Sequence, residues 1–226
     1  MKIRTLLTPF FVFFYFTSNL ALAEGELMVM PASTKVFNSH EQKVKLRNMG
    51  DSTLYLSINL QKVINPGLAP EKKVALAELA HPELISSPDK LSLGPNQTRV
   101  VTLKSLVEPD QESLYRLYIV PVRSLRVEDA PQDKITAPMS VSIGYGVLIR
   151  HMPSPKNQHV AWTYRCEKGG LTLVNNGNVR QLFTRVVVGE SVSEQTIAVF
   201  PGVPRHFKSS RINLSVEDQP QSLVCP

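Results

Sequence analysis

The side chains that could carry catalysis or hold a metal ion are few in this sequence and widely spaced. No His-Glu-x-x-His zinc motif contains any of its five histidines, which are His40, His81, His151, His159 and His206. Neither a Gly-x-Ser-x-Gly nucleophile motif nor a glycine-rich phosphate loop occurs. We therefore expect no catalytic residue, no metal site, no cofactor and no small-molecule substrate.

Cys166 and Cys225 are the only cysteines, and they could form one covalent cross-link. In an oxidising compartment an even pair favours a disulfide over two free thiols. Both cysteines lie after residue 160, so the bridge would join parts of the second half alone. Closing a loop of this size would stabilise that half by roughly 4 kcal/mol in the chain-entropy model.

Residues 139–150 form a long alternating segment that could bind another protein as a strand. Apolar side chains recur at every second position: Met139, Val141, Ile143, Tyr145, Val147 and Ile149. Alternation alone favours an ordinary sandwich strand with one face in the core. However, a strand edge of this length without charge or proline normally invites aggregation, which indicates a partner that covers it. Backbone hydrogen bonds would then supply affinity, and the alternate side chains would supply specificity.

The rest of the sequence predicts a β-scaffold that could position this strand. Short alternating apolar runs, ended by Gly, Pro, Asn and Asp clusters, predict strands at residues 44–47, 53–63, 90–93, 98–103, 115–122, 139–149, 162–165, 171–174, 182–188, 196–200 and 211–215. Only residues 72–80 indicate a helical turn. Pro153 and Pro155 stiffen a connection between two sets of strands. We expect an all-β chain of two immunoglobulin-like sandwiches, 24–153 with the alternating strand and 154–226 with the cysteines.

The first 23 residues have the pattern of a cleaved signal peptide. Lys2 and Arg4 precede an apolar run of about 11 residues, which is too short to span a bilayer. Ala21-Leu22-Ala23 then fits a cleavage site. Without Lys2 and Arg4 the formal net charge falls from +6 to +4, and the remaining basic residues are scattered. That distribution does not favour a nucleic-acid binder.

Taken together, these features resemble the periplasmic chaperones of chaperone–usher pilus systems, nearest their divergent α (alternative) class. The resemblance covers essentially the whole mature chain. It rests on short motifs in a shared order: residues 34–37 (Thr-Lys-Val-Phe), 91–97 (Leu-Ser-Leu-Gly-Pro-Asn-Gln), 111–117 (Gln-Glu-Ser-Leu-Tyr-Arg-Leu), 139–149 and 175–178 (Asn-Asn-Gly-Asn). It implies two sandwiches set at an angle in a boomerang shape, with a cleft between them, in a periplasmic protein that is not an enzyme.

The resemblance also implies a mechanism. Chaperones of this family donate an edge strand to a pilus subunit that lacks its last strand, prevent its aggregation and deliver it to an outer-membrane usher. The donor residues would be Met139, Val141, Ile143, Tyr145 and Val147, although Val147 lies near the cleft, where its side chain could instead pack in the chaperone's own core. The partners would be pilin or tip adhesin subunits and the usher.

Two basic cleft residues of the family anchor the subunit's C-terminal carboxylate. The corresponding positions here hold Thr34 and Leu148, neither of which is basic. Lys35 and Arg150 are the nearest basic residues, and Arg116 or Arg47 are alternatives. A charge-assisted clamp at a chain terminus would fix the register of the bound subunit.

Two other functions stay open from the sequence. A structural pilus subunit or adhesin would also explain secretion, β-structure and one disulfide. Such a subunit would carry its own donor strand near residue 24, but Pro31 interrupts the apolar run there. The third possibility is a periplasmic hydrolase with a nonstandard site on a sandwich scaffold.

Overall fold

The computed structural model describes residues 27–122, 143–191 and 193–226, and its regular elements are almost all β-strands. Within these ranges the exceptions are two single-turn 3-10 helices, η1 (Leu76–Glu78) and η2 (Pro155–Asn157). The predicted all-β class is confirmed. Residues 72–80, where a helical turn was expected, form strand β5 and η1. No helix in the described part has the length and hydropathy needed to cross a bilayer.

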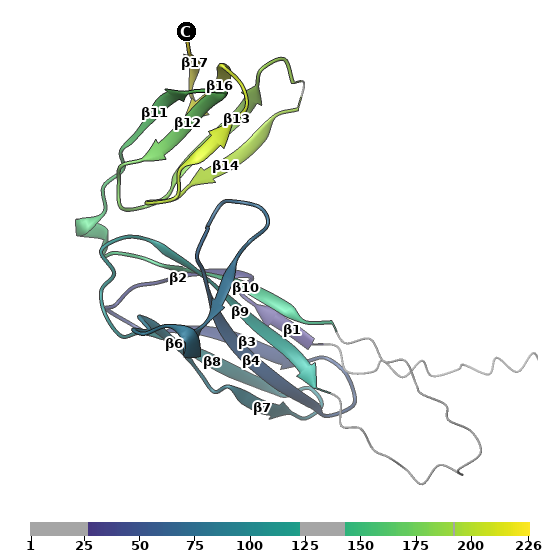
Figure 1. Cartoon of the computed structure of the whole chain (residues 1–226). Coiled ribbons are helices and arrows are strands. Elements are labelled where there is room, and N and C mark those ends of the chain that lie inside the picture. Colours follow the sequence, from purple (N-terminus) through teal and green to yellow (C-terminus); the bar gives the residue numbers. More distant parts are fainter. Residues whose placement is uncertain (1–26, 123–142, 192) are drawn as a thin grey trace, which may run out of the picture.

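The first sandwich consists of two sheets (Figure 1). One sheet has the order β1-β3-β8-β6, with strands β1 (Leu27–Met30), β3 (Gln42–Asn48), β8 (Thr98–Ser105) and β6 (Leu84–Ser87). The other has the order β2-β10-β9-β4-β5, with β7 also paired to β4. Its strands are β2 (Ser33–Val36), β10 (Tyr145–His151), β9 (Ser113–Val122), β4 (Leu54–Val63), β5 (Lys73–Ala75) and β7 (Lys90–Leu93).

Alternation along each strand decides which side chains fill the core between these sheets. In β3, Val44 and Leu46 are fully buried, while Lys43, Lys45 and Arg47 are exposed. Strands β4, β8, β9 and β10 add buried rows to the same cluster. Because successive side chains of a strand point to opposite faces, one face of each sheet fills the core and the other is left for solvent or a partner.

The second sandwich is smaller and is built in the same way. One sheet has the order β11-β12-β15, with β11 (Trp162–Glu167), β12 (Gly170–Asn175) and β15 (Arg205–Phe207). The other has the order β14-β13-β16-β17, with β14 (Gln195–Val199), β13 (Gln181–Val188), β16 (Arg211–Val216) and β17 (Gln219–Val224). In its core Trp162 meets the buried Phe183 edge-on, with ring centroids 5.0 Å apart.

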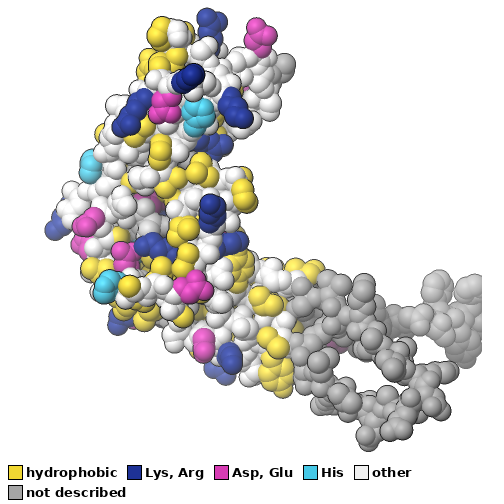
Figure 2. Space-filling view, viewed as in Figure 1, with side chains coloured by type: hydrophobic (Ala, Val, Ile, Leu, Met, Phe, Trp, Pro, Cys, Tyr) yellow, Lys and Arg dark blue, Asp and Glu magenta, His cyan; other side chains and the backbone are white. Residues whose placement is uncertain are grey.

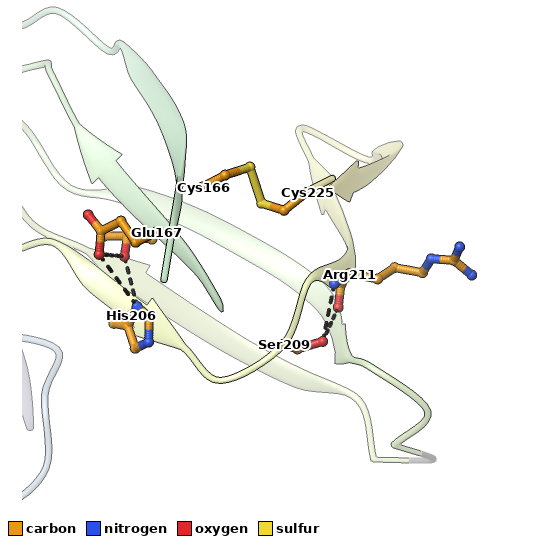
Figure 3. Close-up of a disulfide and its surroundings, with 7 residues drawn as sticks. Cys166, Glu167, His206, Ser209, Arg211 and Cys225 are labelled. Carbon is orange, nitrogen blue, oxygen red and sulfur yellow. Dashed lines mark hydrogen bonds and ion pairs between the residues drawn. A yellow bond between two sulfur atoms is a disulfide. The ribbon is translucent and has the colours of Figure 1, made fainter. Parts of the chain in front are cut away.

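The predicted disulfide between Cys166 and Cys225 is present in the second sandwich (Figure 3). Cys166 lies in β11, and Cys225 directly follows β17, 59 residues later in the sequence. Leu223 is the single buried residue of β17. The bridge therefore ties a sparsely buried edge strand of one sheet to the edge strand of the other.

The two sandwiches meet at an angle and pack against each other directly (Figure 1). Phe200 of the second sandwich lies in a small buried cluster with Val63 and Leu114 of the first. The loop after β4 also reaches across, because Arg205 donates a hydrogen bond of 2.7 Å to the carbonyl oxygen of Gly67. Figure 2 shows the hollow between the two lobes. We propose the domain boundary after residue 153, between β10 and η2.

Candidate functional site

Strand β10 is paired along only part of one of its two edges. It pairs antiparallel with β9 along its whole length, from Tyr145 to His151. On its other edge it pairs in parallel with β2, but only from Leu148 to His151. Within the described residues, the backbone from Tyr145 to Val147 thus has a partner strand on one side alone. This half of β10, called the free edge below, can accept another strand.

The side chains of the alternating segment divide between surface and core. Ile143, just before β10, is 71% exposed. Tyr145 is partly buried and packs against the core of the first sandwich. Val147 is only 1% exposed and belongs to that core, which is the alternative that the sequence left open for its side chain. Met139 and Val141 lie outside the described residues.

Lys35 and Arg150 lie side by side on the face of the sheet that is turned away from the core. They are direct partners in the β2–β10 register. The ammonium group of Lys35 is exposed and makes no hydrogen bond or ion pair with any described residue. The guanidinium of Arg150, in contrast, donates to both carboxylate oxygens of Glu112, at 2.6 and 2.9 Å. Arg150 is therefore already neutralised within the chain.

Glu112 is the centre of a polar node between the two sandwiches. Its side chain is fully buried, and one of its carboxylate oxygens also accepts the backbone N–H of Arg180 at 2.8 Å. Its own backbone N–H donates to the carbonyl oxygen of Asn178 at 2.7 Å. Burial lowers the pKa of the Arg180 guanidinium, and the nearby charge of Arg150 lowers it further. The sequence motifs at 111–117 and 175–178 contain Glu112 and Asn178, but their contact was not predicted, and Arg180 lies outside both motifs.

The two alternative cations differ in position. Arg116 of β9 is the register partner of Leu148 in β10, on the same outer face as Lys35. It donates to Glu71 at 2.7 and 3.2 Å, and this hydrogen bond lowers the pKa of the Glu71 carboxyl. Both side chains remain more than a quarter exposed. Arg47 lies on β3 in the other sheet of the sandwich, so it does not face this surface.

The cluster of Thr172, Glu167 and His206 in the second sandwich is hydrogen-bonded in a way that does not suit a nucleophilic hydroxyl. The Thr172 hydroxyl donates to Glu167 at 2.8 Å and lies 2.9 Å from Nδ1 of His206. A nucleophilic hydroxyl would give its proton to the imidazole instead. A cavity of about 570 Å³ lies where the sandwiches meet, and its charged lining residues are Lys62, Glu83, Asp110 and Glu112. Lys62 and Glu83 pair with each other at 3.0 Å, and Glu112 pairs with Arg150. The described part of the chain also holds no group of three potential metal ligands.

Comparison with curated proteins finds relatives with fimbrial names. No protein-family model matches the chain. It is 30% identical over 160 residues to a CFA/I fimbrial subunit of Escherichia coli, and 25% identical over 160 residues to a CS1 fimbrial subunit of the same species. Each match spans 70% of this chain and 66% of the relative. The chain thus covers just under two thirds of the length of these relatives.

Solved structures match over most of the chain. A chain of "Chaperone-tip adhesin complex is vital for synergistic activation of CFA/I fimbriae biogenesis" has a TM-score of 0.69 at 22% identity, covering 88% of this chain and 98% of its own. "Class 5 Fimbriae Chaperone CfaA" has a TM-score of 0.65 at 21% identity, covering 89% and 100%. The structure of "Salmonella enterica SafA pilin in complex with the SafB chaperone" gives 0.56 at 12% identity, covering 88% and 96%. At these identities the likeness concerns the fold.

Proposed function

Because this chain has the two-sandwich fold of the chaperone–usher pilus chaperones, we propose that it is a periplasmic chaperone for fimbrial subunits. The chain binds a subunit whose own sandwich lacks a strand, covers its exposed apolar groove and delivers it to an outer-membrane usher. Binding requires no covalent chemistry, because strand addition supplies backbone hydrogen bonds and side-chain burial alone. Residues 1–23 would direct the chain to the periplasm and then be removed.

The observation that carries this proposal is the free edge of β10. A strand edge with unpaired N–H and C=O groups is a template for another chain, and proteins normally block such edges. Here β2 stops pairing at Leu148, and the exposed Ile143 continues the apolar row beyond the strand. We propose Met139, Val141, Ile143 and Tyr145 as the side chains that enter the subunit. The backbone of Val147 contributes to the edge, while its side chain stays in the core.

We propose that the carboxylate anchor uses Lys35 together with Arg116. Lys35 is exposed and has no ionic partner among the described residues. Arg116 lies on the same face, and its partner Glu71 is accessible enough to be exchanged for an incoming carboxylate. Arg150 is a weaker candidate than the sequence suggested, because freeing it would break the ion pair that it makes with the fully buried Glu112.

Native mass spectrometry of tagged protein from the periplasm of its own host tests strand donation. Ile143→Arg places a charge in the donated row, and we expect the wild type to carry one subunit per chain and this variant to carry none. Ile85→Arg is the matched control, because Ile85 is a partly exposed isoleucine on β6 of the opposite sheet. A complex that survives Ile143→Arg would overturn the proposal.

The same measurement decides the second candidate function. The curated relatives are named as fimbrial subunits, which favours a structural subunit. A structural subunit would self-associate into a ladder of oligomers, whereas a chaperone gives a monomer or a one-to-one complex. The likeness to solved chaperones over 88–89% of the chain favours the chaperone.

A further inference from the structure

The free edge of β10 has an unusual outer face, which its own side chains leave bare. Gly146 of β10 and Gly144, just before the strand, are the positions from which side chains would cover this face, opposite to the core residue Val147. Two side chains of the neighbouring strand β9 cover them instead. A β-carbon added to Gly146 would lie 3.5 Å from Cε1 of Tyr118, and one added to Gly144 would lie 3.2 Å from Cγ2 of Val120.

The Tyr118 ring is held in this position from its far side. The ammonium of Lys73 on β5 donates to its hydroxyl at 2.9 Å and lies 5.3 Å from the ring centroid. Tyr118 is also the direct register partner of Gly146. An aromatic side chain opposite a glycine commonly covers the exposed backbone of a strand. Here the Tyr118 ring is partly exposed, so a bound partner could contact it.

The geometry places this ring within reach of any strand that pairs with the free edge. Neighbouring strands lie about 4.8 Å apart, so a normal β10 side chain would stand between β9 and the added strand. At Gly146 no side chain stands there. The added strand would lie two strand spacings from β9, about 9.6 Å away, and the Tyr118 ring already covers part of that distance, because its Cε1 lies 3.5 Å from the place of a Gly146 β-carbon. Tyr118 and Val120 would then form an apolar wall facing the outer row of the added strand.

We propose that Tyr118, assisted by Val120, is a specificity-determining contact for the bound subunit. It selects a subunit strand with an apolar side chain opposite Gly146, on the face that the donated row does not touch. This inference rests on the proposed function, but it concerns a different face of the interface. Tyrosine is among the residues that most often dominate binding energy at protein interfaces.

Site-specific photo-cross-linking in the host periplasm tests this contact. A benzophenone amino acid replaces Ile143, Tyr118 or Tyr55 in the full chain. Tyr55 is the control, because it is an exposed tyrosine on the same sheet face but lies on β4, beyond β9. We expect cross-links from positions 143 and 118 to the same strand of the same subunit, and none from position 55.

A second measurement is the fraction of the chain that is purified together with subunit. Tyr118→Ser should lower this fraction about tenfold, and Tyr55→Ser should leave it unchanged.

The outcomes separate this inference from the proposed function. Cross-linking from 143 without cross-linking from 118, or from 118 to a different segment, overturns the role of Tyr118 and leaves strand donation intact. Absence of subunit from the products at both 143 and 118 overturns strand donation itself. A purely structural role for Tyr118 would weaken recovery in Tyr118→Ser but would give no cross-link from 118.

Discussion

His151 is a residue whose surroundings predict a pH response. It is fully buried at the end of β10, and its Nε2 lies 2.7 Å from the hydroxyl oxygen of Ser105. That hydroxyl donates its proton to the carbonyl oxygen of Val107 at 2.7 Å, so Nε2 must be the donor to Ser105. Nδ1 then carries no proton and has no partner among the described residues. Burial lowers the pKa of His151, although the nearby Glu83 opposes this effect and Lys62 adds to it.

Stability should therefore fall as the solution becomes acidic. The unfolded chain binds a proton at His151 near its ordinary pKa of about 6.5, while the folded chain resists protonation to lower pH. Stability is thus fully present above that value and declines below it, by at most about 1.4 kcal/mol per pH unit. Urea unfolding at pH 7.5 and 5.5 should show a smaller loss in His151→Gln than in the wild type. The exposed His81→Gln is the control, and equal losses in all three proteins would contradict the prediction.

At the scale of strands, the sequence predicted long strands well and short edge strands poorly. The expected 53–63, 98–103 and 115–122 runs correspond closely to β4, β8 and β9. These strands carry enough alternating residues to show their period. Strands β5 and β15 have three residues each, and β17 buries only Leu223, so none presents a detectable alternation. The chain also crosses between sheets from β1 to β2, which no local pattern signals.

Alternation in the sequence was also insufficient to define the candidate site. Alternation identified the segment around β10, but it assigned Val147 to the binding row, because period two does not distinguish core from partner. Only the length of β2 decides where the free edge begins. The Tyr118–Gly146 contact depends on the β9–β10 register, which the sequence alone did not provide.

Strand β17 gives a prediction about the disulfide. With one buried residue it is held mainly by its pairing with β16 and by the Cys166–Cys225 bridge. Replacing both cysteines by alanine should lower the free energy of unfolding by about 4 kcal/mol, as expected for a loop of this length. Binding of the proposed fimbrial subunit at low temperature should persist, because the bridge lies in the other sandwich from β10. Denaturant unfolding of the variant, with the reduced wild type for comparison, measures the loss; a folded variant that no longer binds its partner would contradict this account.

The arrangement of the whole molecule depends on contacts that join residues far apart in the sequence. Glu112 and Arg180 are separated by 68 positions, and Arg205 reaches Gly67 across 138. Each partner alone is an ordinary polar residue of a loop or strand, so no sequence pattern marks the pair. The alternation of apolar residues within each strand does not predict the apolar contact of Phe200 with Val63 and Leu114 either. The angle between the sandwiches is consequently a property of these long-range contacts.

Glu112 is the residue whose change should loosen that arrangement most. Glu112→Gln removes the only buried counter-charge that the described residues offer to Arg150, whose side chain is just 12% exposed. Breaking a buried ion pair from one side costs on the order of 3 kcal/mol, since the remaining charge stays uncompensated. We expect the variant to unfold at lower urea concentration, and small-angle X-ray scattering to show a broader distribution of distances between the sandwiches. The double variant Glu112→Gln with Arg150→Met also removes the uncompensated charge of the Arg150 guanidinium, so it should recover part of the lost free energy of unfolding. If the double variant is no more stable than Glu112→Gln, the ion pair would be incidental. The sandwiches would then be held by the hydrogen bond from the N–H of residue 112 to the Asn178 carbonyl oxygen and by the one from the N–H of Arg180 to the side chain of residue 112.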